Sequence, residues 1–292
     1  MQFTDLTVVR RTLKLARPLL KYGASILVLL AGTAAPLSAE LTITQLANEG
    51  VMISDGESRI LIDAMVVEPY SVYGGLPENA ASLFHQLSGP FSEIDLVLVS
   101  HRHHDHNQPA YACEFMQASQ NALLVSSSQV IGLMREKCRE FSVNSPRMRQ
   151  IDPQYGEPYV LESESAKVSI FPLSHGTRSY ALIENYGHLI EIGEFKVVHL
   201  GDAAMDATDF IRAGLDKVEL DVALIPFWYF QPGPGSELVE KFLKAPRQIA
   251  VHIPPGEMLE VEEYMQETFP DVIILKNPLD TLRVSELTQP LP

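Results

Sequence analysis

The densest group of metal-binding side chains in the sequence lies at residues 100–107, which read Ser-His-Arg-His-His-Asp-His-Asn. Imidazole nitrogens and carboxylate oxygens are the usual ligands of zinc and similar ions. In an extended segment, residues two apart point the same way, so His101 and His103 can face one ion. Asp105 and His106 follow as the chain turns, and adjacent side chains diverge, so they can face a second ion. His104 lies between the two pairs and is expected to point away.

The segments on either side of this group predict where it lies in the fold. Residues 95–99 form a short apolar, β-branched run that is typical of a buried strand, and residues 108–117 predict a helix. The group therefore lies on a loop at the C-terminal end of a strand, where open α/β sheets usually place their chemistry. A histidine-rich loop without a function is the alternative. However, four ligand-type residues directly after a buried strand are hard to explain as ordinary surface residues.

The pattern His-x-His-x-Asp-His after a hydrophobic strand resembles the metallo-β-lactamase superfamily, and further motifs follow in the family's order. His175 and Gly176 follow a predicted strand at 167–171, Gly201 and Asp202 follow one at 196–200, and His252 follows one at 248–251. The resemblance covers about residues 41–285. It implies an α/β (α+β) fold, the four-layer αββα sandwich of that superfamily.

The resemblance also implies a ligand set for two divalent metal ions. The first ion would be held by His101, His103 and His175, the second by Asp105, His106 and His252, with Asp202 bridging the two. These donors suit Zn, with Mn and Fe as alternatives. Asp63 resembles the family's acidic residue that supports the metal loop without binding metal, although capping a turn would also explain it. His188 and His199 are expected to be structural.

The implied activity is that of a dinuclear metal-dependent hydrolase. Paired ions lower the pKa of a bridging water, and the resulting hydroxide attacks a carbonyl or phosphorus while Asp105 holds it in line. The ligands implied for the second metal ion include no Cys. This ligand set differs from that of the β-lactamases that use a Cys ligand, and it is more similar to that of hydrolases of lactones, thioesters or phosphodiesters. The layout most resembles the branch of ascorbate-phosphate lactonase and N-acylethanolamine-phospholipid phospholipase D. A β-lactam hydrolase, or a non-catalytic metal-binding or partner-binding protein on this scaffold, is the alternative.

Three further residues are candidates for contact with a small-molecule or lipid-like substrate. Arg178 follows His175 closely and could bind an anionic group, or it could be a surface residue. Trp228 and Tyr229 belong to an aromatic run at 227–230, which could form either core or the wall of an apolar pocket. By resemblance, residues 65–79 form a substrate-facing flap.

Residues 1–39 have the layout of a secretory signal peptide. A basic start precedes an apolar run at 24–35, and Ala39 is the expected cleavage position. Arg10 and Arg11 partly match a twin-arginine export signal. The sequence therefore predicts an exported protein, periplasmic or extracellular, with a hydrolase domain at 40–292. A retained membrane anchor is the alternative, and it would be the protein's only link to a membrane.

The net charge indicates which partners the protein can bind, and the two cysteines bear on the redox state of its compartment. Removing residues 1–39 leaves 17 Lys and Arg against 36 Asp and Glu, a net charge of −19. Such a field repels phosphate backbones, so no nucleic-acid partner is expected. Cys113 and Cys138 are the only cysteines, and they could pair in an oxidising compartment or remain buried thiols. The sequence does not indicate an oligomeric state.

The remaining hydrophobic patterns predict the rest of the elements. The predicted strands are 41–46, 51–54, 59–63, 123–126, 148–151, 158–161, 180–184, 188–192, 220–226, 272–275 and 281–284. The predicted helices are 78–87, 128–140, 206–213, 236–243 and 257–267.

Overall fold

A computed structural model describes residues 40–138, 145–176 and 178–285, with the backbone alone for Arg178. The predictions for residues 1–39 lie outside the described residues. None of the helices in the described part of the chain is long and apolar enough to cross a membrane.

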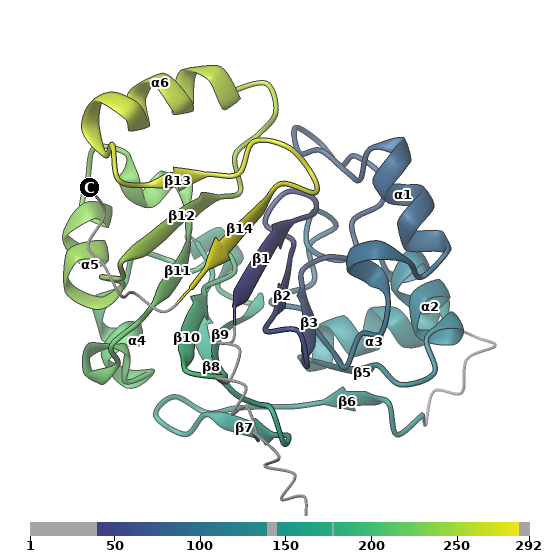
Figure 1. The fold of residues 1–292 in the computed structure, drawn as a ribbon. Coiled ribbons are helices and arrows are strands. Elements are labelled where there is room, and N and C mark those ends of the chain that lie inside the picture. The colour runs from purple at the N-terminus through teal and green to yellow at the C-terminus, as the bar shows by residue number, and fades with distance from the viewer. Residues whose placement is uncertain (1–39, 139–144, 177, 286–292) are drawn as a thin grey trace, which may run out of the picture. The chain divides into compact units, whose positions relative to one another are not determined.

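The strands form two mixed sheets (Figure 1). In spatial order the first sheet consists of β14 (Thr281–Val284), β1 (Leu41–Gln45), β2 (Val51–Ser54), β3 (Arg59–Ile62), β4 (Leu96–Leu98), β5 (Leu123–Ser126) and β6 (Met148–Gln150). The second consists of β13 (Ile273–Ile274), β12 (Arg247–Val251), β11 (Val222–Pro226), β10 (Phe195–His199), β9 (Glu184–Ile192), β8 (Ala166–Ser174) and β7 (Tyr159–Glu162).

Helices cover the outer face of each sheet. On the first sheet lie α1 (Glu78–His85), α2 (Pro109–Ala118) and α3 (Ser128–Lys137), and on the second lie α4 (Ala207–Arg212), α5 (Gly235–Phe242) and α6 (Met258–Thr268). Short 3-10 turns lie at Gly89–Phe91, Arg178–Tyr180, Leu215–Lys217 and Phe227–Phe230. Ser127 caps α3 by accepting a hydrogen bond from the Val130 N–H at 3.4 Å.

Successive side chains of each strand point to opposite faces of the sheet, and the apolar ones form three separate cores. Ile43, Ile62 and Leu98 of the first sheet face Ile190 and Leu224 of the second, which forms a core between the sheets. The opposite faces of the same strands pack against the helices. The layers are therefore helix, sheet, sheet and helix, which confirms the predicted αββα sandwich.

One predicted element is wrong. We expected strands at 180–184 and 188–192 with a turn between them, but β9 is continuous from Glu184 to Ile192 and pairs along its whole length with β8. Gly187 lies opposite Phe171, and a Cβ at Gly187 would lie 2.4 Å from that ring. The glycine therefore makes room for an aromatic side chain within a strand, and it does not mark a turn.

The structure also decides between the two alternatives for the cysteines. Cys113 of α2 and Cys138 at the end of α3 form a disulfide, with their Cα atoms 5.5 Å apart. The bond ties together α2 and α3, two of the three helices that cover the first sheet.

Candidate metal centre

All seven predicted metal ligands lie at the C-terminal ends of strands. The loop after β4 carries His101, His103, Asp105 and His106, while His175, Asp202 and His252 follow β8, β10 and β12. Because β10, β11 and β12 run parallel, the loops after β10 and β12 emerge at the same edge of the second sheet. The fold thus brings together side chains that are up to 151 positions apart in the sequence.

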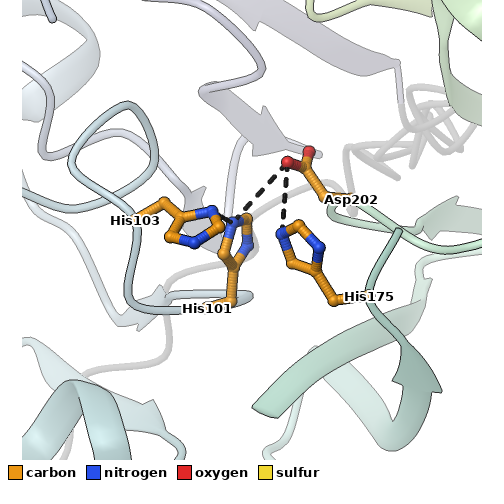
Figure 2. A group of neighbouring side chains, drawn as sticks. All are labelled: His101, His103, His175 and Asp202. Atoms are coloured by element: carbon orange, nitrogen blue, oxygen red, sulfur yellow. Dashed lines mark hydrogen bonds and ion pairs between the residues drawn. The ribbon is translucent and has the colours of Figure 1, made fainter. Parts of the chain in front are cut away.

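The first group consists of His101, His103, His175 and Asp202, whose ligand-type atoms lie within 4.8 Å of one another (Figure 2). His101 Nε2 lies 2.9 Å from His103 Nδ1. Asp202 Oδ2 lies 3.7 Å from His101 Nε2 and 3.4 Å from His175 Nε2. Three imidazoles and a carboxylate that converge in this way match the ligand set of a catalytic zinc-type site.

The second group lies on the other side of the same carboxylate. Asp202 Oδ1 is 3.2 Å from both His106 Nε2 and His252 Nε2. Asp105 Oδ2 is 3.4 Å from His252 Nε2 and 3.8 Å from His106 Nε2. The two oxygens of Asp202 therefore face different groups of histidines, which is the arrangement that the predicted bridging role requires.

The electrostatics of both groups suit a cation. Burial lowers the pKa of His101 and of His103, so these rings are neutral and offer lone pairs. Burial also lowers the pKa of His106, but Asp202 and Asp63 outweigh that effect and raise it well above its usual value. Both ring nitrogens of His175 and Oδ1 of Asp202 are buried without a hydrogen bond. Buried polar atoms that are left unpaired in this way fit a metal ion.

Asp63 orients a predicted ligand from behind. Its Oδ1 accepts the Ser100 N–H at 2.7 Å, and its Oδ2 lies 2.8 Å from His106 Nδ1. His106 Nε2 is thereby turned towards Asp202 and His252. This is the carboxylate–histidine arrangement that commonly supports metal sites, and it agrees with the supporting role expected for Asp63.

The backbone around Asp202 is held in place by its neighbours. Asn185 Oδ1 accepts the Asp202 N–H at 3.1 Å, while its amide donates to Leu200 O at 3.1 Å. Gly201 has a φ of +55°, and a Cβ there would lie 2.4 Å from Asn185 Oδ1 and 2.6 Å from Ser100 Cβ. The glycine of the Gly-Asp motif is therefore required by both conformation and space.

We expect Gly201→Ala to lower the free energy of unfolding by about 2–4 kcal/mol, because it combines a left-handed backbone with overpacking. Denaturant unfolding of the metal-free protein would measure this. Gly132→Ala is the matched control, since a Cβ at Gly132 in α3 meets no atom within 4 Å. It should be neutral or stabilising. Equal stabilities for the two variants would contradict the steric requirement at Gly201.

A cavity of about 660 Å³ opens beside the first group. Its walls are Tyr70, Ser71, Tyr73, His103, Asp105, His175, Gly176, Tyr180, Asp202, Ala203, Ala204, Met205 and Trp228. Tyr70 and Tyr73 come from the predicted flap, which Gln108 Oε1 anchors by accepting the N–H groups of Val67 and Glu68 at 3.0 and 2.9 Å. The flap thus borders the cavity as expected.

The three predicted substrate residues have different surroundings. Trp228 lies in the cavity wall, with its ring 4.9 Å from that of His252. Tyr229 does not reach the cavity, which corrects our prediction. It is fully buried, and its hydroxyl donates to Ala203 O at 2.9 Å, so it supports the loop after Asp202. The side chain of Arg178 lies outside the described residues.

Other histidines lie apart from the two groups. His104 stacks on Tyr70 with the ring centroids 5.2 Å apart, and His85 contacts Glu114 on the surface. Our interpretation missed Glu49, which is fully buried next to the second group, and Asn185. Asn185 falls in the turn that we expected between 184 and 188, and Glu49 resembles an ordinary turn residue, so neither residue stands out in the sequence.

Comparisons with known proteins agree with the geometry. Residues 58–270 match the beta-lactamase superfamily domain. A search of curated proteins found no match.

Several solved structures share the fold at low sequence identity. The isothiocyanate hydrolase from Delia radicum gut bacteria has a TM-score of 0.61 at 15% identity, covering 84% of this chain and 99% of its own. The metallo-beta-lactamase fold protein YhfI from Bacillus subtilis has a TM-score of 0.56 at 16% identity, covering 84% and 100%. The diiron β-hydroxylase CmlA from Streptomyces venezuelae has a TM-score of 0.54 at 15% identity, covering 86% and 55%. The family match shows that this chain belongs to the beta-lactamase superfamily, and the solved structures show that it shares the metallo-β-lactamase fold.

Proposed function

We propose that the protein is an exported dinuclear metal-dependent hydrolase that acts on a neutral ester or lactone. One observation carries the dinuclear part of this proposal. Asp202 points Oδ2 towards His101 and His175 and Oδ1 towards His106 and His252. A carboxylate can bind one ion with each oxygen, and this one has a set of imidazoles on either side.

The chain's own residues would divide the chemical work. When bound, two divalent ions supply an activated water and stabilise negative charge on the substrate oxygen. Asp105 lies in the cavity wall and carries a carboxylate that can accept a hydrogen bond from that water and hold it in line. The histidines bind the ions, and Asp63 fixes the ring of His106. Tyr73 and Trp228 flank His252 and limit the access of bulk water.

The cavity wall supports a neutral substrate. Tyr70, Tyr73, Tyr180 and Trp228 supply aromatic surface, and Asp105 and Asp202 supply negative charge. Among the described lining residues there is no lysine or arginine that could neutralise a phosphate. These features favour a carbonyl substrate with an apolar or aromatic group over a phosphodiester. The isothiocyanate hydrolase on the same fold is named for another small neutral substrate.

Export and the choice of metal belong to the same proposal. The predicted signal peptide at 1–39 supports export, as does the disulfide between Cys113 and Cys138, since such bonds persist in oxidising compartments. The His and Asp donor set suits Zn as well as Mn or Fe. The strongly negative net charge of residues 40–292 supports a small-molecule substrate and no nucleic-acid partner.

The test is a substrate panel with the mature, metal-loaded protein. It includes an aryl ester, an acyl-lactone, a thioester, an isothiocyanate, a β-lactam and a phosphodiester. We expect turnover of an ester or lactone that carries an apolar group, and loss of that turnover in Asp105→Ala. Preferred turnover of the phosphodiester would overturn the substrate class. No turnover, with two ions bound, would favour the non-catalytic metal-binding alternative.

A further inference from the structure

Glu49 is a buried carboxylate that no part of the proposed mechanism uses. It lies in the turn between β1 and β2, is fully buried, and neither of its side-chain oxygens makes a hydrogen bond. Burying a carboxylate that accepts no hydrogen bond is unfavourable, and a cation close by would offset that cost.

The turn holds Glu49 firmly against the metal centre. Gln45 Nε2 donates to Asn48 O at 2.7 Å, and Asn48 Nδ2 donates to the backbone oxygen of Asp105 at 3.0 Å. A Cβ at Gly50 would lie 2.5 Å from Asp63 O, so the backbones of the two loops touch. The turn is therefore fixed to the loop that carries Asp105 and His106, and to the loop of Asp63, which orients His106.

The carboxylate lies within reach of a shared ion. Ligand-type atoms of Glu49, His106, Asp202 and His252 all lie within 4.8 Å of one another. An ion about 2–2.5 Å from each donor fits such a spacing. Asp105, which is 3.4 Å from His252, belongs to the same neighbourhood and lies in the cavity wall, whereas Glu49 is fully buried.

His199 supports Glu49 in the way that a carboxylate supports a ligating histidine. Its Nδ1 accepts the Gly201 N–H at 3.3 Å, so the ring proton lies on Nε2, which is 3.2 Å from Glu49 Oε1. Glu49, Asp63 and His199 also lie close together, but both oxygens of Asp63 are already engaged by Ser100 and His106. The carboxylate of Glu49 is therefore available to an ion held by the second group.

We propose that Glu49 is a further ligand of the second metal position, together with Asp105, Asp202, His106 and His252. The proposal rests on the dinuclear function proposed above. It gives this position three carboxylates and only two imidazoles. Such an oxygen-rich ligand set favours Mn or Fe more than the three-histidine position does.

The test is Glu49→Gln, which keeps the size and removes the charge. We expect the dissociation constant of one of the two ions to rise about 100-fold, while the other stays unchanged. Competition with a chelator measures both constants, for Zn and for Mn, with a larger effect for Mn. Glu191→Gln is the control, since Glu191 pairs with Lys167 at 2.8 Å away from the centre.

Thermal unfolding separates a ligand from a purely structural residue. We expect the metal-free variant to have an equal or higher Tm than the metal-free wild type, because an amide is less costly to bury than a carboxylic acid or carboxylate. The rise in Tm on adding metal should be smaller than in the wild type. A lower metal-free Tm with an unchanged metal-induced rise would overturn the proposal.

The outcome also distinguishes an error in the role of Glu49 from an error in the dinuclear site. If the wild type holds two ions and Glu49→Gln leaves both constants unchanged, only the role of Glu49 is wrong. If the wild type holds a single ion, the dinuclear proposal fails and this one fails with it.

Discussion

Asp105→Asn is expected to lower kcat/KM for hydrolysis about 1000-fold while the protein stays folded. Asp105 combines a place in the cavity wall with a side-chain oxygen 3.4 Å from His252 Nε2. Its carboxylate can accept a proton from an attacking water, and an amide of the same size cannot. Positioned general bases contribute about 100-fold to 10,000-fold, and the expected loss lies within that range. Steady-state kinetics on the best substrate of the panel measure it.

Two controls make this result specific. Asp216→Asn changes an exposed carboxylate and should leave the kinetics unchanged. The metal content of Asp105→Asn should be determined at saturating metal, so that loss of an ion is not mistaken for loss of the base. A rate within about tenfold of the wild type, with both ions bound, would exclude Asp105 as the proton acceptor.

The sequence predicts the site better than its surroundings. Spacing and periodicity place each predicted ligand after a strand, and the resemblance to the metallo-β-lactamase superfamily implies which of them lie together. His101 lies with His175, and His252 lies with His106, as that resemblance implies. The four-layer fold is likewise implied by the resemblance, and the strands explain it. Strands that are apolar on both faces need a second sheet on one side and helices on the other.

Three features could not be predicted because they depend on contacts between distant segments. Gly187 looks like a turn residue until Phe171 is seen beside it. Tyr229 follows Trp228 directly, yet neighbouring side chains in the 3-10 turn Phe227–Phe230 point in different directions, so one lines the cavity and the other enters the core. Glu49 follows Asn48 in an apparently ordinary turn, and only its burial against His106 and His252 reveals it.

Asp202→Asn is expected to have the largest effect on metal binding, because its two carboxylate oxygens face the two different groups of histidines. An amide offers one oxygen, and its other atom carries hydrogens that repel a cation. The oxygens of Asp202 lie 3.4 Å from His175 Nε2 and 3.2 Å from His252 Nε2. The asparagine variant can therefore present an oxygen to only one of the two groups of histidines. We expect the apparent affinity of at least one ion to fall 100-fold or more, roughly the upper end of the effects seen for supporting residues. Activity should fall below detection.

Elemental analysis after dialysis against a weak chelator would measure this, with two ions per chain expected for the wild type and one or fewer for the variant. Asp206→Asn is the matched control four positions along the same loop. Asp206 caps α4 by accepting the Thr208 N–H at 2.8 Å, and asparagine caps helices equally well, so metal content and stability should not change. Two tightly held ions in Asp202→Asn would mean that the two groups of ligands are independent, and that a bridging carboxylate is not what joins them.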